Sequence, residues 1–111
     1  RLILADALDY AANYKPKAVV DTATLTGAAV VTFGHLVAGL MGTDEALIKK
    51  IFNAGEKTNE RVWELPLYDD YNKLMKSEVA DIKNIGPQRQ AGTIMGGIFL
   101  KKFADKKYPW A

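Results

Sequence analysis

The sequence predicts an α/β fold in which helices cover a mixed, largely parallel sheet. Segments with helical periodicity alternate with short segments rich in β-branched residues, and Gly or Pro residues separate them. Because strands joined through helices run in the same direction, this alternation favours a parallel sheet. Of the 111 residues 49% are hydrophobic, so we expect one small domain with a buried core.

The first predicted elements are a helix and a buried strand. Residues 2–14 place leucine and alanine side chains on one face at helical spacing, and Pro16 then ends the helix. Residues 17–24 (KAVVDTAT) are rich in β-branched side chains, which predicts a buried strand. Residues 25–27 form the turn that leaves the carboxyl end of this strand.

A short helix, a second strand and a longer helix follow. Residues 28–33 are a short apolar segment typical of a helical turn. Residues 37–41 predict the second strand, which Gly42 closes. Thr43 is placed to cap a helix over residues 44–59, because its side-chain oxygen can accept a hydrogen bond from the first turn.

The second half of the chain contains more irregular structure. In order, we expect an extended segment over 61–67, a short polar helix over 68–76, a loop over 77–90, a helix over 92–104 and the start of a strand at 108–111. The helix over 92–104 includes Gly92, Gly96 and Gly97, which thin one of its sides. These glycines let the helix lie close against another backbone.

Composition excludes several classes of protein. Fifteen Lys and Arg against thirteen Asp and Glu leave a formal net charge of +2, so the charge predicts neither a nucleic-acid partner nor an anionic membrane partner. The chain has no cysteine, which excludes disulfides and thiolate metal sites. No apolar run approaches the roughly twenty residues that span a bilayer. We expect a soluble protein of the cytoplasm.

Both ends of the sequence indicate a partial domain. The chain opens inside an amphipathic pattern without a capping residue, and residues 108–111 look like the beginning of an apolar strand. Natural domain boundaries are usually polar and flexible. We therefore expect residues 1–111 to be part of a larger catalytic domain, truncated at both ends.

The segment DTATLTGA, residues 21–28, is the strongest candidate for a binding site. It lies at the carboxyl end of a predicted strand, which is where ligands bind in open α/β sheets. Backbone groups at Thr24, Leu25 and Gly27 would be free to pair with an extended substrate, and Gly27 would allow close approach. On pattern alone, a simple connection between elements is the more common explanation of such a segment.

A family resemblance gives this segment a function. The runs RLILADALDYA, DTATLTGA, EVADIKNIG and AGTIMGGIFLKKF are similar, in order and spacing, to the catalytic domain of the leucyl aminopeptidases. Arg1 and Leu2 resemble the last two letters of that family's N-T-D-A-E-G-R-L motif. The resemblance covers essentially the whole chain. It implies a three-layer α/β/α sandwich like that of zinc exopeptidases, and a homohexamer that removes leucine-like N-terminal residues from peptides.

The resemblance also assigns site residues. It implies that Arg1 is catalytic and holds a bicarbonate ion, since a planar guanidinium binds an oxyanion through two hydrogen bonds. It implies that Thr24, Leu25 and Gly27 bind the substrate peptide. The family's two divalent metal ions, zinc or manganese, are held by residues that precede Arg1, so no metal ligand is expected in this chain.

Other polar residues do not replace the missing ligands. The adjacent Asp69 and Asp70 diverge on a helix, Asp81 stands alone, and His35 has no partner at triad spacing. We therefore expect the isolated chain to be inactive, as one part of a metal-dependent aminopeptidase. The alternative is an independent α/β binding or interaction module without a hydrolytic role.

Overall fold

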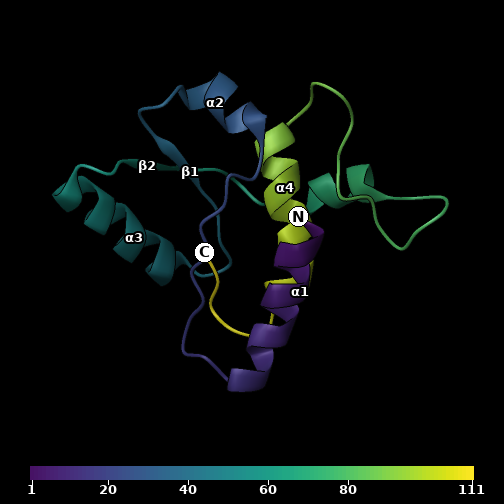
Figure 1. The fold of residues 1–111 in the computed structure, drawn as a ribbon, viewed down its shortest axis with the longest axis horizontal. Helices are drawn as coiled ribbons and strands as arrows, with labels where there is room; N and C mark the ends of the chain where they lie inside the picture. The colour runs from purple at the N-terminus through teal and green to yellow at the C-terminus, as the bar shows by residue number, and fades with distance from the viewer.

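The computed structural model describes residues 1–111, and its elements are arranged around one central helix (Figure 1). In chain order they are α1 (Leu2–Ala11), the 3₁₀ segment η1 (Ala12–Tyr14), α2 (Gly27–Phe33), β1 (Ala38–Leu40), α3 (Glu45–Thr58), β2 (Val62–Glu64), the 3₁₀ segment η2 (Asp69–Met75) and α4 (Gly92–Ala104). The predicted helices over 2–14, 28–33, 44–59 and 92–104 and the strand over 37–41 are therefore confirmed, whereas neither residues 17–24 nor residues 108–111 form a strand beyond a single bridge. The polar segment after β2 is a 3₁₀ helix.

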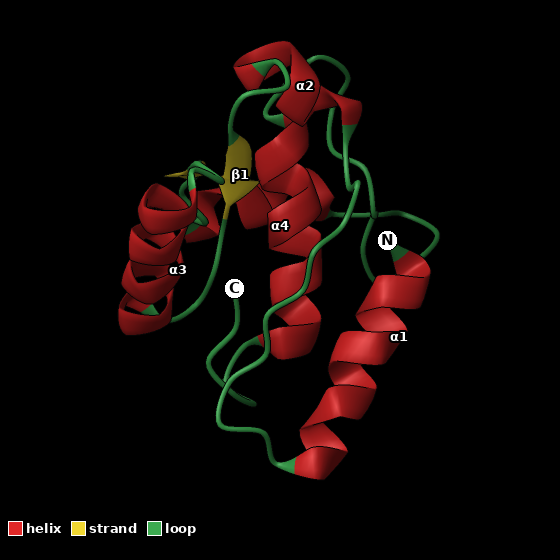
Figure 2. Cartoon of the chain, turned by 60° about the vertical axis from the view of Figure 1, so that its left-hand side comes forward, coloured by secondary structure: helices red, strands yellow, loops and turns green.

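Helix α4 forms the centre of the core. Its fully buried residues include Met95, Ile98, Phe99 and Leu100, and α1 packs against it through Ala5 and Leu8. Ile98 and Phe99 belong to the face that predicted α4, but residues 95–97 and 100 are buried as well, so the helix is buried on more sides than its periodicity indicates. Figure 2 shows α4 running between α1 and the β1 side of the molecule.

The glycines of α4 make room for side chains. A Cβ atom added at Gly96 would lie 2.9 Å from Leu25 Cδ2, and one added at Gly97 would lie 2.5 Å from Met41 Sδ. The close approach that the sequence predicted exists. The neighbouring groups are side chains of the segments that flank β1 and α2, whereas the prediction named a backbone.

The sheet is parallel and small. Strands β1 and β2 pair in parallel through Ala38 with Val62 and Leu40 with Glu64, and α3 connects them. A separate parallel bridge joins Val19 to Trp110. Helical crossovers between parallel strands make this an α/β fold, as predicted.

The prediction of a buried strand over residues 17–24 is wrong in its burial and its length. Only Val19 forms a bridge, Val20 is 55% exposed, and residues 22–24 are exposed. β-branched residues favour an extended backbone, but burial also needs neighbours on both edges and both faces. Within this chain the segment pairs on one edge only, with Pro109 and Ala111.

The cap of α3 is Asp44, one residue after the predicted Thr43. The backbone N–H of Leu47 donates a 2.7 Å hydrogen bond to Asp44 Oδ1. The hydroxyl of Thr43 instead accepts from the backbone N–H of Trp110 at 3.2 Å. The Thr43 hydroxyl, which the local pattern predicted as the cap of α3, therefore forms a contact with a segment distant in sequence instead.

No helix of the chain is both long enough and apolar enough to span a bilayer.

Candidate functional site

The segment DTATLTGA lies on the surface between the Val19 bridge and α2. Thr24 is exposed, and Leu25 and Thr26 are half-buried. The backbone N–H and C=O groups of Thr24 and Leu25 make no backbone hydrogen bond within the chain. These groups are therefore available to a ligand, as strand edges are for an extended peptide.

Side chains hold this segment against α4. Leu25 packs into the space beside Gly96, and the Thr26 hydroxyl lies 3.3 Å from the hydroxyl of Thr93. Thr93 is 9% exposed and stands in the first turn of α4. The segment thus has fixed side chains and free backbone polar groups, which is a suitable arrangement for presenting a backbone to a ligand.

Thr24 and Leu25 border a cavity of about 340 Å³, hereafter the apolar cavity. Met41, Val62 and Leu100 supply apolar parts of its wall. Such a volume with mostly apolar lining and a few polar backbone groups is typical of small-molecule sites.

Gly27 begins α2 and does not line the apolar cavity. A Cβ atom added there would meet nothing within 4 Å, so the space above it is open in this chain. The close approach that we expected at Gly27 therefore involves no residue of the chain itself.

Arg1 precedes α1 and reaches the loop after η2. One of its guanidinium nitrogens, Nη1, donates a hydrogen bond to the backbone carbonyl of Asn84. Arg1 also lines a second cavity, of about 680 Å³, hereafter the arginine cavity. None of the three salt bridges of the chain involves Arg1. Its charge is therefore not neutralised by any carboxylate of the chain.

The arginine cavity and the apolar cavity meet at Thr93, which lines both. The structure thus brings Arg1 and the Thr24–Leu25 segment to neighbouring hollows on the surface. Sequence reasoning did not single out Thr93 or Asn84. A threonine in the first turn of a glycine-rich helix was the available signal for Thr93, but its contact with Thr26 depends on the tertiary fold.

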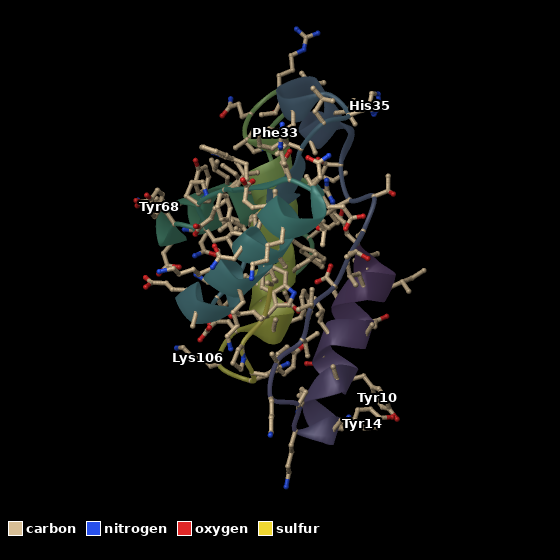
Figure 3. The ribbon with its side chains drawn as sticks, turned by 90° about the vertical axis from the view of Figure 1, so that its left-hand side faces the viewer. Tyr10, Tyr14, Phe33, His35, Tyr68 and Lys106 are labelled. Atoms are coloured by element: carbon tan, nitrogen blue, oxygen red, sulfur yellow. The ribbon has the colours of Figure 1, made fainter.

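The remaining polar candidates are separate from these cavities. Asp69 pairs with Lys101 at 3.2 Å, and Asp70 lies 3.8 Å from Lys73. His35 is exposed just beyond α2, at the opposite end of the molecule from Tyr10 and Tyr14 (Figure 3). No three His, Asp or Glu residues of the chain gather where they could hold a metal ion.

Tyr108 is the one group whose pKa departs clearly from its ordinary value. Burial raises the pKa of its hydroxyl, and the nearby carboxylates of Asp21 and Asp9 raise it further. The hydroxyl donates a hydrogen bond to the backbone carbonyl of Leu8 in α1. Tyr108 is thus a neutral structural donor that joins the end of the chain to α1.

Comparison with known proteins assigns the chain to a family. The family model described as "Cytosol aminopeptidase family, catalytic domain" matches residues 1–111. The chain belongs to this family. It is 54% identical over 111 residues to the "Probable cytosol aminopeptidase" of Nitrosomonas eutropha, and 52% identical to the "Cytosol aminopeptidase" of Pseudomonas aeruginosa strain PAO1. Both comparisons cover 100% of the chain and 22% of the relative.

A solved structure of a family member shows the same fold. A mutant of tomato leucine aminopeptidase matches with a TM-score of 0.90 and 43% sequence identity, over 96% of this chain and 21% of that protein. The α/β architecture and the relation to the leucyl aminopeptidases are therefore both established. The chain spans about a fifth of the length of the cytosol aminopeptidases that it matches.

Proposed function

We propose that these 111 residues are part of the catalytic domain of an aminopeptidase, here called the parent enzyme, which removes leucine-like N-terminal residues from peptides. The observation that carries the proposal is the free backbone of Thr24 and Leu25 beside an apolar cavity that adjoins the cavity of Arg1. The names of the relatives support an activity of this kind.

The Thr24–Leu25 segment binds the peptide in this proposal. A substrate in extended conformation pairs with its backbone N–H and C=O groups, and the side chain of the N-terminal residue enters the apolar cavity. The lining by Met41, Val62 and Leu100 favours an aliphatic side chain through burial. The bare Cα of Gly27 lets the peptide backbone pass the start of α2 without a steric clash.

Arg1 is the proposed catalytic residue of the chain. Arg1 lines a cavity that no Asp or Glu of the chain borders, so an anion can approach it without repulsion from a carboxylate of the chain. Two parallel N–H donors suit a carbonate-like oxyanion. A bound bicarbonate supplies a base for a proton of the attacking water. Arg1 orients that base, with its own position fixed by the hydrogen bond to Asn84.

The residues of this chain do not fit a metal site. No cluster of three His, Asp or Glu is present, and Asp69 and Asp70 both interact with lysines. The resemblance places the ligands of the two divalent ions, zinc or manganese, before Arg1. We therefore derive no catalytic step through metal from these residues, and we propose that the isolated chain is inactive.

Further properties of the parent enzyme follow from the resemblance alone. We propose that it is a homohexamer of the cytoplasm that acts on peptides. The alternative, an independent binding module, predicts that the 111 residues bind a ligand without any hydrolytic contribution.

Two polypeptides test the proposal: the 111-residue chain and the parent enzyme, which includes the residues before Arg1. Each is assayed with leucyl p-nitroanilide, with and without Mn²⁺ or Zn²⁺. We expect metal-dependent turnover by the parent enzyme only. Turnover by the short chain, abolished by a chelator, would contradict the proposed absence of metal ligands. Inactivity of the folded parent enzyme with either metal would favour the binding module.

A further inference from the structure

A second arginine, which the proposed reaction does not use, lines the arginine cavity. Arg1 and Arg89 both line it, and none of its 15 lining residues is Asp or Glu. Neither arginine takes part in a salt bridge. In a chain with fifteen basic and thirteen acidic residues, this cavity has an unbalanced positive charge.

Two further features of the cavity agree with an anionic ligand. Gly92, Thr93 and Ile94, the first turn of α4, line it, and no side chain caps this helix. The first N–H groups of a helix carry partial positive charge. Gln88 and Gln90, the sequence neighbours of Arg89, also line the cavity and are neutral residues that can form hydrogen bonds.

The rest of the lining is apolar. Ala28, Val31, Leu65 and Ile85 contribute to it. The complementary ligand therefore has an uncharged body and a negative group at one end. A short peptide with a free C-terminal carboxylate has this character. The arginine cavity also shares Thr93 with the apolar cavity, which the proposed peptide-binding segment borders.

We propose that Arg89 is a specificity-determining residue, which binds the carboxylate of the leaving part of the substrate. Because Arg1 binds the catalytic anion in the proposed reaction, Arg89 is the arginine of the cavity that can bind a second anionic group. This inference rests on the proposed aminopeptidase function. It predicts that the parent enzyme prefers di- and tripeptides with a free C-terminal carboxylate to the same peptides with a C-terminal amide.

The expected preference is modest, because Arg89 is exposed and solvent screens its charge. We expect kcat/KM for the free acids of Leu-Ala and Leu-Ala-Ala to exceed that for the matched amides by about three- to tenfold. Most of the difference should be in KM, since the carboxylate does not change charge during the reaction.

The test compares these four peptides in the wild-type parent enzyme, in Arg89→Gln and in Lys102→Gln. Arg89 has a positive φ of 60°, and glutamine experiences the same backbone strain as arginine there, so the substitution changes charge with little effect on folding. Lys102 is an exposed cation on α4 outside the cavity, and its substitution removes one charge as a matched control.

We expect the acid-to-amide ratio to fall to about one in Arg89→Gln and to stay at the wild-type value in Lys102→Gln. A wild-type ratio of one, or an unchanged ratio in Arg89→Gln, would overturn the inference. An equal fall of the ratio in both variants would assign the preference to overall charge and would overturn it as well. Turnover of leucyl p-nitroanilide, which has no carboxylate, is measured on the wild-type enzyme in parallel. If that substrate is not hydrolysed, the proposed function itself has failed, and not only the role of Arg89.

Discussion

The indole Nε1 of Trp110 donates a 2.6 Å hydrogen bond to Oδ2 of Asp21, which lies 89 positions earlier in the chain. Two backbone hydrogen bonds run beside it, from Asp21 N–H to the carbonyl of Ala111 and from Ala111 N–H to the carbonyl of Val19. Asp21 is also the first residue of the DTATLTGA segment. The contact therefore connects the proposed peptide-binding segment to a buried aromatic side chain.

We predict that Asp21→Ala destabilises the parent enzyme. The substitution leaves the indole N–H of Trp110 without an acceptor, and Trp110 is only 3% exposed. An unsatisfied buried donor costs about 1–3 kcal/mol. Asp21→Asn keeps an oxygen acceptor and should recover most of the loss. Denaturant unfolding monitored by tryptophan fluorescence measures both variants, and equal stability of Asp21→Ala and wild type would contradict the role of the contact.

Gly42 should tolerate no larger residue. A Cβ atom there would lie 2.5 Å from the carbonyl oxygen of Trp110, a backbone atom that cannot rotate away. Overpacking of this kind costs about 1–3 kcal/mol. We predict a lower melting temperature for Gly42→Ala, measured by differential scanning fluorimetry. An unchanged melting temperature would mean that the Trp110 segment can shift freely.

Gly27 should show the opposite behaviour. Nothing of the chain lies within 4 Å of a Cβ atom added there, so Gly27→Val should change the unfolding free energy by less than about 0.5 kcal/mol. If the substrate backbone passes this position, the same substitution should raise KM or lower turnover in the parent enzyme. Unchanged steady-state kinetics would place the peptide elsewhere.

We predict that ionisation of Tyr108 lowers the stability of the folded protein at high pH. Its pKa in the folded protein is raised above the ordinary value of 10.0, first by burial and then by Asp21 and Asp9. A raised pKa favours the protonated phenol in the fold, so the contribution is fully present below pH 10.0 and is lost as the pH rises through the folded-state pKa.

The pH dependence is measured by denaturant unfolding between about pH 8 and pH 11.5. Tyr108→Phe removes the titrating group and the hydrogen bond to Leu8, so this variant should be less stable at neutral pH and show a shallower decline above pH 10.0. An equally steep decline in both proteins would mean that other groups cause it.

Local pattern predicted much of this fold but not its long-range contacts. The spacing of apolar residues predicted α4, and two of those residues, Ile98 and Phe99, are buried in the core. The predictions of burial for residues 17–24 and of the cap of α3 were wrong, because both features depend on contacts with residues distant in the sequence. Thr43 is the clearest case, since its hydroxyl binds Trp110.

The site shows the same division. The motif DTATLTGA was recognisable from its position after an extended segment, and the family resemblance singled out Arg1. The contact of Arg1 with Asn84, and the position of Thr93 between the two cavities, arise from packing of α4 against the loops around it. No periodicity or spacing in the sequence contains that information.

The most direct measurement of the proposed role of Arg1 is bicarbonate stimulation of the parent enzyme, compared between wild type, Arg1→Lys and Arg1→Ala. If Arg1 orients a bicarbonate base, Arg1→Ala should lower kcat by about 10²–10⁴, the usual size of general acid–base assistance, with a smaller change in KM. Lysine should restore only part of the rate, because a point charge cannot donate two parallel hydrogen bonds. Added bicarbonate should raise the rate of the wild type and leave that of Arg1→Ala unchanged. Equal stimulation of both proteins would show that the anion binds elsewhere and would contradict the catalytic role of Arg1.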